Sequence, residues 1–303
     1  MVKITVPATS ANMGPGFDCI GMAFNMYNVL FVERMKKPGL CIEVENFGDV
    51  IPNNNENMIY QTIQDFFYRV GKKMPGIHMI QRDNIPISRG LGSSAACIVA
   101  GLMAANELSE VYLSRDEIAQ LAARIERHPD NVAPAIYGGM VVGAMERDHK
   151  YMNFVKFTVP ESLSFAVMIP EFTLSTEIAR GILPKTLNRD EAVFNISRAA
   201  LLVSSIVSEQ WGNLKIATED ALHQPFRKEL IPNMEEIFEK ADDAGSLGYF
   251  LSGAGPALIA LIKKKDEDKF SKEMNSFLSG LSDVWNLHLL RPNNDGATIE
   301  PVE

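Results

Sequence analysis

The sequence predicts a globular protein that contains both helices and strands and forms one large domain or two domains of ordinary size. The chain has 303 residues, of which 46% are hydrophobic and 22% charged, as in globular proteins. A chain of this length can bury a large core. Short segments with strand-like patterns are interspersed with segments of helical periodicity. The pattern changes near Lys156, so we expect a boundary there between domains 1–155 and 156–303.

Composition and charge narrow the class of function. The net charge of −9 argues against nucleic acid as a partner. The three cysteines, Cys19, Cys41 and Cys97, are scattered and form neither a metal-binding spacing nor a disulfide framework, which indicates a reducing compartment. The N-terminus lacks the apolar core of a signal peptide, and no apolar run approaches the roughly 20 residues that span a bilayer. We therefore expect a cytoplasmic protein that does not bind membranes.

The chain opens with a strand at 3–6 and a loop at 7–21 that is rich in glycine and small polar residues. Asn12 and Asp18 are its strongest side-chain hydrogen-bonding groups. Such a loop between core elements often carries function, but these side chains could equally satisfy their own backbone in a turn. Further along, we expect strands at 27–34, 40–45 and 76–83, a polar loop at 52–57 and a helix at 58–70.

The segment 86–96 has the character of a phosphate-binding loop. Gly90 and Gly92 allow a tight turn, two serines follow, and a good helix-forming run extends from Ala95 to Leu108. Backbone N–H groups that lead into a helix N-terminus favour anions. No lysine follows Gly92, so this is not the common nucleotide-binding loop, and a glycine turn capped by Ser93 is the structural alternative.

A second polar cluster follows the next predicted helix. Ser114 and Glu117 form a capping box that opens this helix, which extends to Glu126. His128, Asp130 and Asn131 then lie between two prolines, directly before an apolar, glycine-bearing strand expected at 136–143. This crowding of polar groups favours a site over a purely structural histidine.

The C-terminal half combines strands and helices around a late glycine cluster at 252–257. That cluster lies between two strands and is either a hairpin turn or a second anion contact. In the long helix at 190–210 we expect Val193, Ile196, Leu201 and Val203 to face inward. The remaining predicted elements are strands at 164–169, 249–251, 258–262 and 284–289, helices at 176–181, 214–222 and 234–244, and a charged helix between the last two strands.

Together, the first loop, the 86–96 segment and the late glycine cluster resemble the three motifs of the GHMP kinase superfamily, in order and at similar separations. The first loop and 128–135 closely resemble the homoserine kinases of that superfamily. The resemblance covers nearly the whole chain, from Val6 to Pro256. It implies an α+β fold with an N-terminal ATP-binding domain, which contains a left-handed β-α-β unit, and a ferredoxin-like C-terminal domain.

The resemblance also implies a reaction and its participants. ATP would phosphorylate the hydroxyl of L-homoserine to give O-phospho-L-homoserine, a step in threonine biosynthesis, with Mg²⁺ as cofactor and with a homodimer as the assembly. Phosphoryl transfer rewards positioning and charge neutralisation, so we expect no dedicated catalytic base.

By the same resemblance, each site residue receives a role. A guanidinium suits a carboxylate, so Arg180 and Arg227 would bind the substrate carboxylate. The full substrate set is Asn12, Asp18, His128, Asp130, Thr176, Arg180 and Arg227. The ATP set is Asn57, near the adenine, with Pro86, Ile87, Ser88, Arg89, Gly90, Leu91, Gly92, Ser93, Ser94, Ala95, Ala96, Gly253 and Gly255.

This sequence departs from the family pattern at three positions. Arg127 replaces a usual glycine before the histidine, and Ala257 replaces a usual hydroxyl residue. The family's magnesium-binding glutamate precedes the histidine by eight residues, where this chain has Gln120. We expect Ser94 and Gln120 at the metal, with Glu117 or water as a substitute, because an amide is a poorer Mg²⁺ ligand than a carboxylate.

Other functions remain compatible with these motifs. Another small-molecule kinase of the superfamily, acting on mevalonate or a sugar, would lack the paired arginines and would have a different first loop. A decarboxylase of the same fold would phosphorylate its substrate before losing CO₂. The Gln120 departure also allows a non-catalytic ATP-binding sensor.

Overall fold

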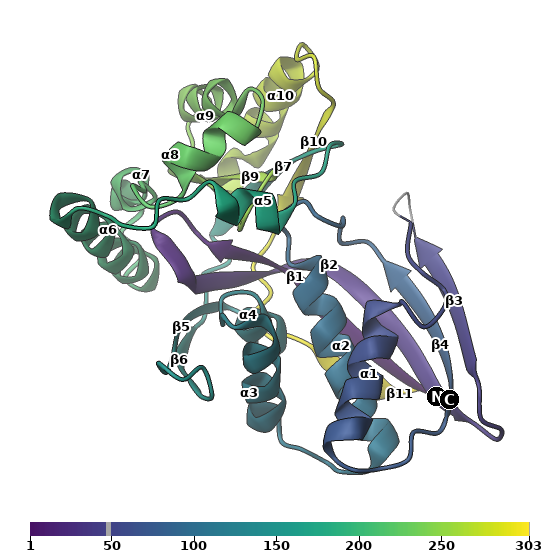
Figure 1. Ribbon diagram of the computed structural model, residues 1–303. Coiled ribbons are helices and arrows are strands. Elements are labelled where there is room, and N and C mark those ends of the chain that lie inside the picture. Colours follow the sequence, from purple (N-terminus) through teal and green to yellow (C-terminus); the bar gives the residue numbers. More distant parts are fainter. Residues whose placement is uncertain (47–49, 303) are drawn as a thin grey trace.

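The computed structural model describes residues 1–46 and 50–302, which form two β-sheets with helices packed on each (Figure 1). In the described chain, the first sheet has seven strands, with β11-β1-β2-β4-β3 in order, β5 paired with β2, and β6 paired with β5. Helices α1 to α4 belong to this first unit. Its strands are β1 (Val2–Asn12), β2 (Gly16–Met35), β3 (Leu40–Asn46), β4 (Gly76–Asp83), β5 (Met140–Met145), β6 (Met152–Phe157) and β11 (Thr298–Pro301). Its helices are α1 (Met58–Arg69), α2 (Ser93–Ser109), α3 (Arg115–Glu126) and α4 (Val132–Tyr137).

Most of the loop predicted at 7–21 is a long hairpin. β1 and β2 pair from Val2 to Asn12, with register shifts after Pro7 and after Ala11. The segment did not show the alternation of a half-exposed strand because residues 6–12 are buried throughout. Pro7 is tolerated because it lies at a register irregularity.

Several helix and strand predictions in this unit hold. β4 has the predicted bounds, and α3 begins with the predicted capping box between Ser114 and Glu117. β3 and β4 pair in parallel and are joined through α1. The strand predicted at 136–143 is wrong at its start, because Ile136 and Tyr137 complete α4. Gly138 and Gly139 then adopt positive φ and redirect the chain into β5.

The second sheet has the strand order β10-β7-β9-β8, and its pairs are antiparallel. Along the chain, helices lie between β7 and β8, β9 follows β8 directly, and α10 lies between β9 and β10. This β-α-β-β-α-β arrangement confirms the ferredoxin-like prediction. The strands are β7 (Leu163–Pro170), β8 (Gly248–Leu251), β9 (Leu258–Lys263) and β10 (Trp285–Leu290). The helices are α5 (Thr176–Gly181), α6 (Arg189–Val207), α7 (Leu214–Ala217), α8 (Gln224–Arg227), α9 (Met234–Asp243) and α10 (Glu267–Leu278), with short 3₁₀ turns at Trp211–Asn213, Lys228–Leu230 and Lys264–Asp266.

Two helix predictions in this half need correction. The side chains of Val193 and Ile196 are 59% and 69% exposed, because α6 lies at the margin of the molecule and buries Leu202 and Ile206 nearer its end (Figure 1). The helix predicted at 214–222 ends at Ala217. The Asp220 carboxylate instead accepts hydrogen bonds from the backbone N–H groups of His223 and Gln224 and so opens α8.

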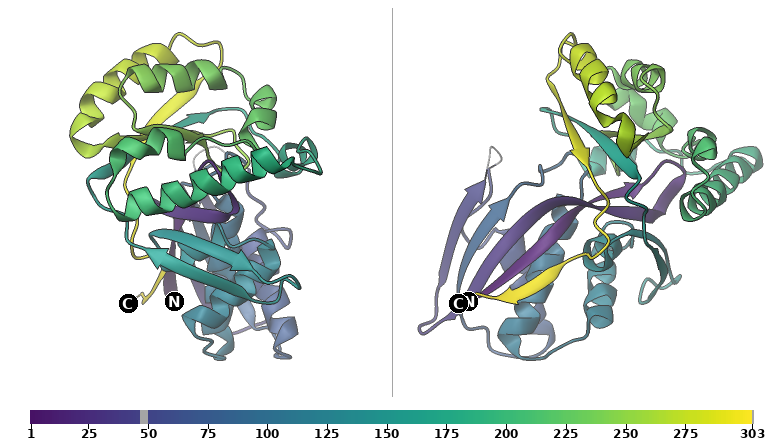
Figure 2. Two further views of the ribbon diagram at one scale, coloured as in Figure 1. Left: turned by 90° about the vertical axis from the view of Figure 1, so that its left-hand side faces the viewer. Right: turned by 180° about the vertical axis from the view of Figure 1, so that it is seen from behind.

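The two units are continuous rather than separated by a linker. β6 extends to Phe157, beyond the boundary predicted near Lys156, and β11 returns to pair with β1. The termini therefore lie side by side (Figure 2). One hydrophobic cluster runs through both units and includes Phe24 and Phe165, whose ring centroids are 5.1 Å apart. A single boundary in the sequence therefore does not separate the two units. None of the described helices is long and apolar enough to cross a membrane.

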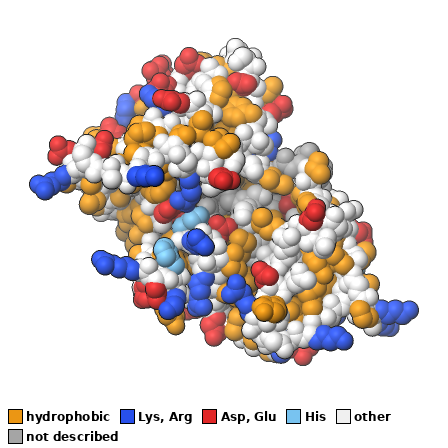
Figure 3. Space-filling view, viewed as in Figure 1, with side chains coloured by type: hydrophobic (Ala, Val, Ile, Leu, Met, Phe, Trp, Pro, Cys, Tyr) orange, Lys and Arg blue, Asp and Glu red, His pale blue; other side chains and the backbone are white. Residues whose placement is uncertain are grey.

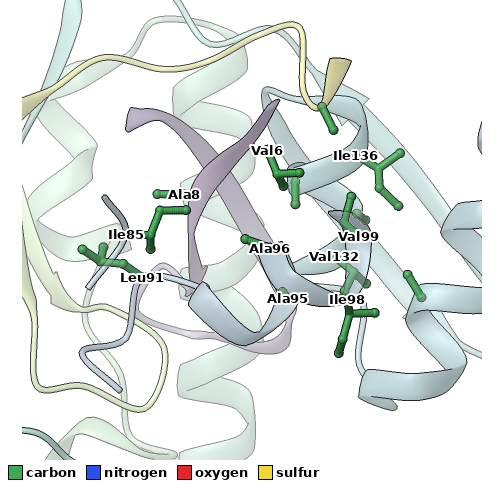
Figure 4. Packing of buried hydrophobic residues seen from close by; sticks show 14 of the residues in the cluster. Val6, Ala8, Ile85, Leu91, Ala95, Ala96, Ile98, Val99, Val132 and Ile136 are labelled. Atoms are coloured by element: carbon green, nitrogen blue, oxygen red, sulfur yellow. The ribbon is translucent and has the colours of Figure 1, made fainter. Parts of the chain in front are cut away.

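The start of α2 rests on this core. Figure 4 shows Ala95, Ala96 and Val99 packed among side chains from β1 and α4. Their small size lets the helix approach the sheet closely. The core thereby fixes the position of the loop that precedes α2.

Candidate functional site

A cavity of about 610 Å³ lies where the two units meet. Figure 3 shows this hollow, with histidine, lysine and arginine side chains gathered beside it. Its walls come from the β1–β2 turn, residues 50–58, the loop before α2, the segment after α3, α5, α8 and the β8–β9 turn. Of the sequence-predicted site residues, those at its walls are Asn12, Asp18, Asn57, residues 86–95, His128, Asp130, Thr176, Arg180, Arg227 and Gly253. Ala96, Gln120 and Gly255 are not among them.

The loop before α2 is anchored through its carbonyl groups. The carbonyl oxygens of residues 88 to 92 accept hydrogen bonds, in order, from Leu174 N–H, Ala257 N–H, the Ser252 hydroxyl, Thr9 N–H and Ala96 N–H. Within the described chain, no hydrogen bond is donated by the N–H groups of residues 90–95. The carbonyls are thus committed to the protein, and the amides remain available to a ligand.

The N-terminus of α2 has no side-chain cap. Its N-cap is Gly92, at φ 71°, so the alternative in which Ser93 caps the helix is wrong. A Cβ on Gly92 would lie 2.0 Å from the Thr9 hydroxyl, and one on Gly90 would lie 2.3 Å from the Ser252 carbonyl oxygen. Both positions also have positive φ. Glycine is therefore required for two reasons, the lack of space for a Cβ and the backbone conformation. An uncapped helix N-terminus at a cavity wall favours an anion.

The late glycine cluster, residues 252–257, supports the loop before α2. β8 and β9 pair on either side of it, which confirms the hairpin alternative. The Gly253 carbonyl accepts hydrogen bonds from Asn12 and Arg227, whereas Gly255 packs against Ile231 and Leu251. The structure therefore corrects Gly255 from a ligand contact to a support, and Ala96 likewise lies in the core.

Asn57 caps helix α1 at the cavity wall. Its side-chain oxygen accepts from Ile59 N–H and Tyr60 N–H, and its amide donates to the Pro52 carbonyl and to Gln81. The side chain is only 1% exposed. Each of its polar atoms is thus engaged with the protein, so the predicted contact with an adenine is not supported by a free side-chain group.

Gln120, expected at the metal, does not line the cavity. Its amide exchanges two hydrogen bonds with the Met152 backbone, at 2.7 and 2.8 Å, and so ties α3 to β6. Glu126, rather than Gln120, lies beside Ser94. Its Oε1 accepts a hydrogen bond from Ser94 Oγ at 3.2 Å, beside the N-terminus of α2. Burial is the main cause that raises the pKa of the Glu126 carboxyl, while His128 and Ser94 oppose the shift.

A carboxylate and a hydroxyl form a hard-oxygen pair that suits Mg²⁺. The pair lies beside the amides that would hold phosphates, where the ion is needed, and a cation there would relieve the buried charge of Glu126. The donor set at Ser94 and Glu126 therefore fits the metal that the resemblance implies.

Asp18 and Arg180 form an ion pair at the cavity wall. The guanidinium donates two hydrogen bonds to the carboxylate, at 2.6 and 3.1 Å. This contact raises the pKa of Arg180. Asn12 holds the turn by accepting from Asp18 N–H, and both residues have positive φ. Asn12 thus acts on its own backbone, as the turn alternative predicted, while Asp18 is directed at the cavity.

His128 and Asp130 complete an acidic recess next to Asp18. His128 Nδ1 lies 2.5 Å from Asp130 Oδ1, and single ligand atoms of Asp18, His128 and Asp130 all lie within 4.8 Å of one another. Burial lowers the pKa of His128, but Asp130, with help from Asp18 and Glu126, outweighs it and raises the pKa. Such a recess would attract a cationic group.

Arg227 is a buried cation that donates to backbone carbonyls. Its Nε donates to the Ala179 carbonyl at 3.0 Å and its NH1 to the Gly253 carbonyl at 2.8 Å. The side chain is 1% exposed, and burial lowers its pKa to about 10. No carboxylate in the described part of the chain forms a salt bridge with it. A buried guanidinium at a cavity wall is a ready partner for an anionic ligand.

The predicted set of site residues omitted several cavity residues, among them Glu126 and Asn131. Asn131 accepts a hydrogen bond from the Thr9 hydroxyl at 2.9 Å. Both belong to the polar cluster around His128, so its density of polar groups was the available signal. Arg127, between Glu126 and His128, is exposed and ends α3 at φ 68°.

Comparisons with known proteins agree with this geometry. Residues 57–139 match the model for the N-terminal domain of GHMP kinases, and residues 199–280 match the model for the C-terminal domain. The chain is 44% identical to a homoserine kinase of Caldicellulosiruptor saccharolyticus, over 100% of this chain and 98% of that protein. It is 43% identical to a homoserine kinase of Clostridium botulinum, over 99% and 98%.

Solved structures of homoserine kinases also resemble this chain. A homoserine kinase from Cytophaga hutchinsonii superposes with a TM-score of 0.87 at 29% identity and covers 99% of this chain and 97% of its own. A structure described as a putative homoserine kinase from Listeria monocytogenes has a TM-score of 0.83 at 31% identity and covers both chains fully. A mevalonate kinase structure, at 17% identity and a TM-score of 0.71, shares the fold.

Proposed function

This chain belongs to the homoserine kinase family of the GHMP kinases, and we propose that it transfers the γ-phosphoryl group of ATP to the hydroxyl of L-homoserine. The products are O-phospho-L-homoserine and ADP, and the reaction serves threonine biosynthesis. One observation carries the proposal. A single cavity joins the unbonded amides before α2 to a recess that holds both carboxylates and guanidinium groups.

The nucleotide phosphates bind at the amides of residues 90–95. The dipole of α2 adds to the attraction, and together they replace the lysine of other nucleotide-binding loops. Because the carbonyls of this loop are already bonded to the protein, it needs little rearrangement to receive a phosphate. Gly253 and Ala254 close the cavity from the C-terminal unit.

The amino acid binds in the charged recess. Homoserine is a zwitterion, and the recess offers groups of both signs. Its ammonium group pairs with Asp18 and Asp130, and its carboxylate with Arg180 and Arg227. The Asp18–Arg180 ion pair then opens so that each residue exchanges a protein partner for one end of the substrate.

The reaction needs no strong base. The transition state of phosphoryl transfer is loose, so correct placement of the hydroxyl and neutralisation of phosphate charge supply most of the rate. His128 is held by Asp130 in a fixed orientation and can direct the hydroxyl without removing its proton in a separate step.

Magnesium is the cofactor we infer. Ser94 and Glu126 would hold it, and when bound it neutralises charge on the phosphates. Glu126 also accepts a hydrogen bond from the Ser94 hydroxyl, which orients both groups.

The test is a coupled assay of ADP release with Mg-ATP and a panel of alcohols. Turnover with L-homoserine, at least tenfold faster than with mevalonate or a sugar, is the expected outcome. Preference for mevalonate or a sugar would assign another kinase of the superfamily. Loss of CO₂ from an acidic substrate would assign a decarboxylase, and ATP binding without turnover would assign a sensor.

Two further properties complete the proposal. We infer a homodimer, which light scattering of the purified protein would test, and a cytoplasmic location. Expression in a strain that lacks homoserine kinase should restore growth without threonine. Growth that still requires threonine, despite soluble expression, would contradict the assigned pathway.

A further inference from the structure

The outer face of the first sheet carries a second group of reactive side chains, away from the cavity. It consists of Glu33 on β2, His78 on β4, and Cys41 and Glu43 on β3, and we call it the sheet-face cluster. The strand register places His78 opposite Glu33 on one side and opposite Cys41 on the other. Glu43 follows Cys41 by two residues and so lies on the same face. None of the four lines the cavity.

The cluster has the geometry of a metal site with a supporting carboxylate. His78 Nε2 lies 3.0 Å from Glu43 Oε1, and single ligand atoms of Cys41, Glu43 and His78 all lie within 4.8 Å of one another. Around a tetrahedral zinc ion, ligand atoms stand roughly 3.3–3.8 Å apart. The three groups can therefore converge on one ion with small side-chain adjustments.

Glu33 supplies an independent indication. Its Oε1 lies 3.0 Å from His78 Nδ1, on the far side of the ring from Cys41 and Glu43. A histidine that binds a metal usually donates its second N–H to a carboxylate, which fixes the tautomer and aims the other nitrogen at the ion. Glu33 and His78 have this arrangement.

We propose that Cys41, Glu43 and His78 bind a borderline-soft divalent cation of the Zn²⁺ type, with Glu33 as the carboxylate that orients His78. One sulfur, one nitrogen and one oxygen ligand favour Zn²⁺ or Co²⁺ over Mg²⁺, which prefers oxygen. Three protein ligands leave a fourth position for water. The ligands come from neighbouring strands of a sheet, so the backbone already holds them together.

The surroundings leave the cluster accessible. Cys41 and Glu43 are exposed, and His78 is partly exposed. Two cations lie near the cluster: the Met1 ammonium stands 3.9 Å from Glu33 Oε2, and Arg82, on the same face, is engaged with Glu45 at 2.7 Å. Cys19 and Cys97 differ, because Cys19 is only partly exposed and Cys97 is buried. Cys41 is therefore the thiol of the described chain best placed to ligate an ion from solvent.

Titration with Co²⁺ tests the proposal, because a cobalt–thiolate bond adds a charge-transfer absorption in the near ultraviolet. The protein should be reduced and free of nucleotide and Mg²⁺. We expect this absorption to saturate at one equivalent of Co²⁺ and to disappear when Zn²⁺ is added. Zn²⁺ should also slow alkylation of Cys41 at least tenfold, as measured by mass spectrometry of the labelled peptide.

Variants assign the signal to the cluster. Cys41→Ser and His78→Gln should each remove the absorption, whereas the matched control Cys19→Ser should retain it. Glu33→Gln should weaken Co²⁺ binding about 10- to 100-fold while the absorption itself persists. Absence of the band, or its persistence in Cys41→Ser, would overturn the proposal. Circular dichroism checks that each variant is folded. These readouts do not depend on kinase activity, so they stand or fall separately from the proposed function.

Discussion

The Arg180 guanidinium and the Asp18 carboxylate, 162 residues apart in the chain, form a two-point ion pair at the wall of the cavity. Each of these groups is also the complement of one end of a zwitterion. In the proposed complex the amino acid takes over both partners of this ion pair, so variants of the pair test the substrate assignment.

Replacement of Asp18 by Asn should weaken homoserine binding while ATP binding changes little. A charged hydrogen bond contributes about 1.5–3 kcal/mol, so the KM for homoserine should rise roughly 10- to 100-fold. Steady-state kinetics with each substrate varied in turn measures both constants. A fall in kcat alone, together with loss of the basic limb of the pH profile, would instead make Asp18 a catalytic base.

Arg227→Lys should reduce discrimination for the substrate carboxylate. Lysine keeps the charge but loses the planar fork that reaches Ala179 and Gly253. We expect kcat/KM for homoserine to fall roughly 10- to 100-fold, consistent with loss of a buried charged contact. 3-Amino-1-propanol, which lacks the carboxylate, serves as the matched substrate and should lose much less. Equal losses for both substrates would show that the variant disturbs the recess as a whole.

Glu126 and Gln120 can be separated by their dependence on Mg²⁺. Glu126→Gln removes the carboxylate beside Ser94 and should raise the free Mg²⁺ concentration required for half-maximal rate by about tenfold or more. Gln120→Glu is the informative counterpart. If Gln120 were the metal ligand, a carboxylate there would lower the Mg²⁺ requirement. Because Gln120 bonds to Met152, we expect no such gain and some loss of stability.

His128 should make stability depend on pH. Its pKa is raised above the usual 6.5, since Asp130 outweighs the opposing effect of burial. A pKa raised by folding stabilises the protein below the unfolded value, and this contribution is lost as the pH rises through the folded value. The free energy of unfolding of the wild type relative to His128→Gln should therefore be largest at about pH 6 and decline as the pH rises above the usual value of 6.5. Urea unfolding across this range measures it, and a difference that grows with pH would contradict the Asp130 pairing.

Arg127→Gly should stabilise the fold. Arg127 ends α3 at φ 68°, a conformation that costs a residue with a side chain about 1 kcal/mol more than glycine. The melting temperature should rise by roughly 2 °C. Arg124→Gly, the same substitution three residues earlier within the helix, should instead destabilise by about 1 kcal/mol. Melting temperatures that move in the same direction would show that the left-handed backbone is not the cause.

Much of the local structure could be predicted from particular residues. Ser114 and Glu117 predict the start of α3, and the apolar periodicity of residues 58–70 predicts α1. Both patterns depend on residues that are close in the sequence. The 7–21 segment and Val193 and Ile196 could not be assigned correctly. Whether a strand is buried on both faces, or which side of a helix meets the core, depends on neighbours that are distant in sequence.

The site shows the same division. The sequence by itself determined that glycines 90 and 92 precede a helix without a lysine, and that polar groups cluster at 126–131, because backbone freedom and residue type are local properties. Only the tertiary structure decided that Glu126 rather than Gln120 meets Ser94, that Gly255 supports the loop from below, and that Asp18 reaches Arg180. Those contacts depend on where folding brings separate segments together, and a hydrogen bond is made or lost within an ångström of that placement.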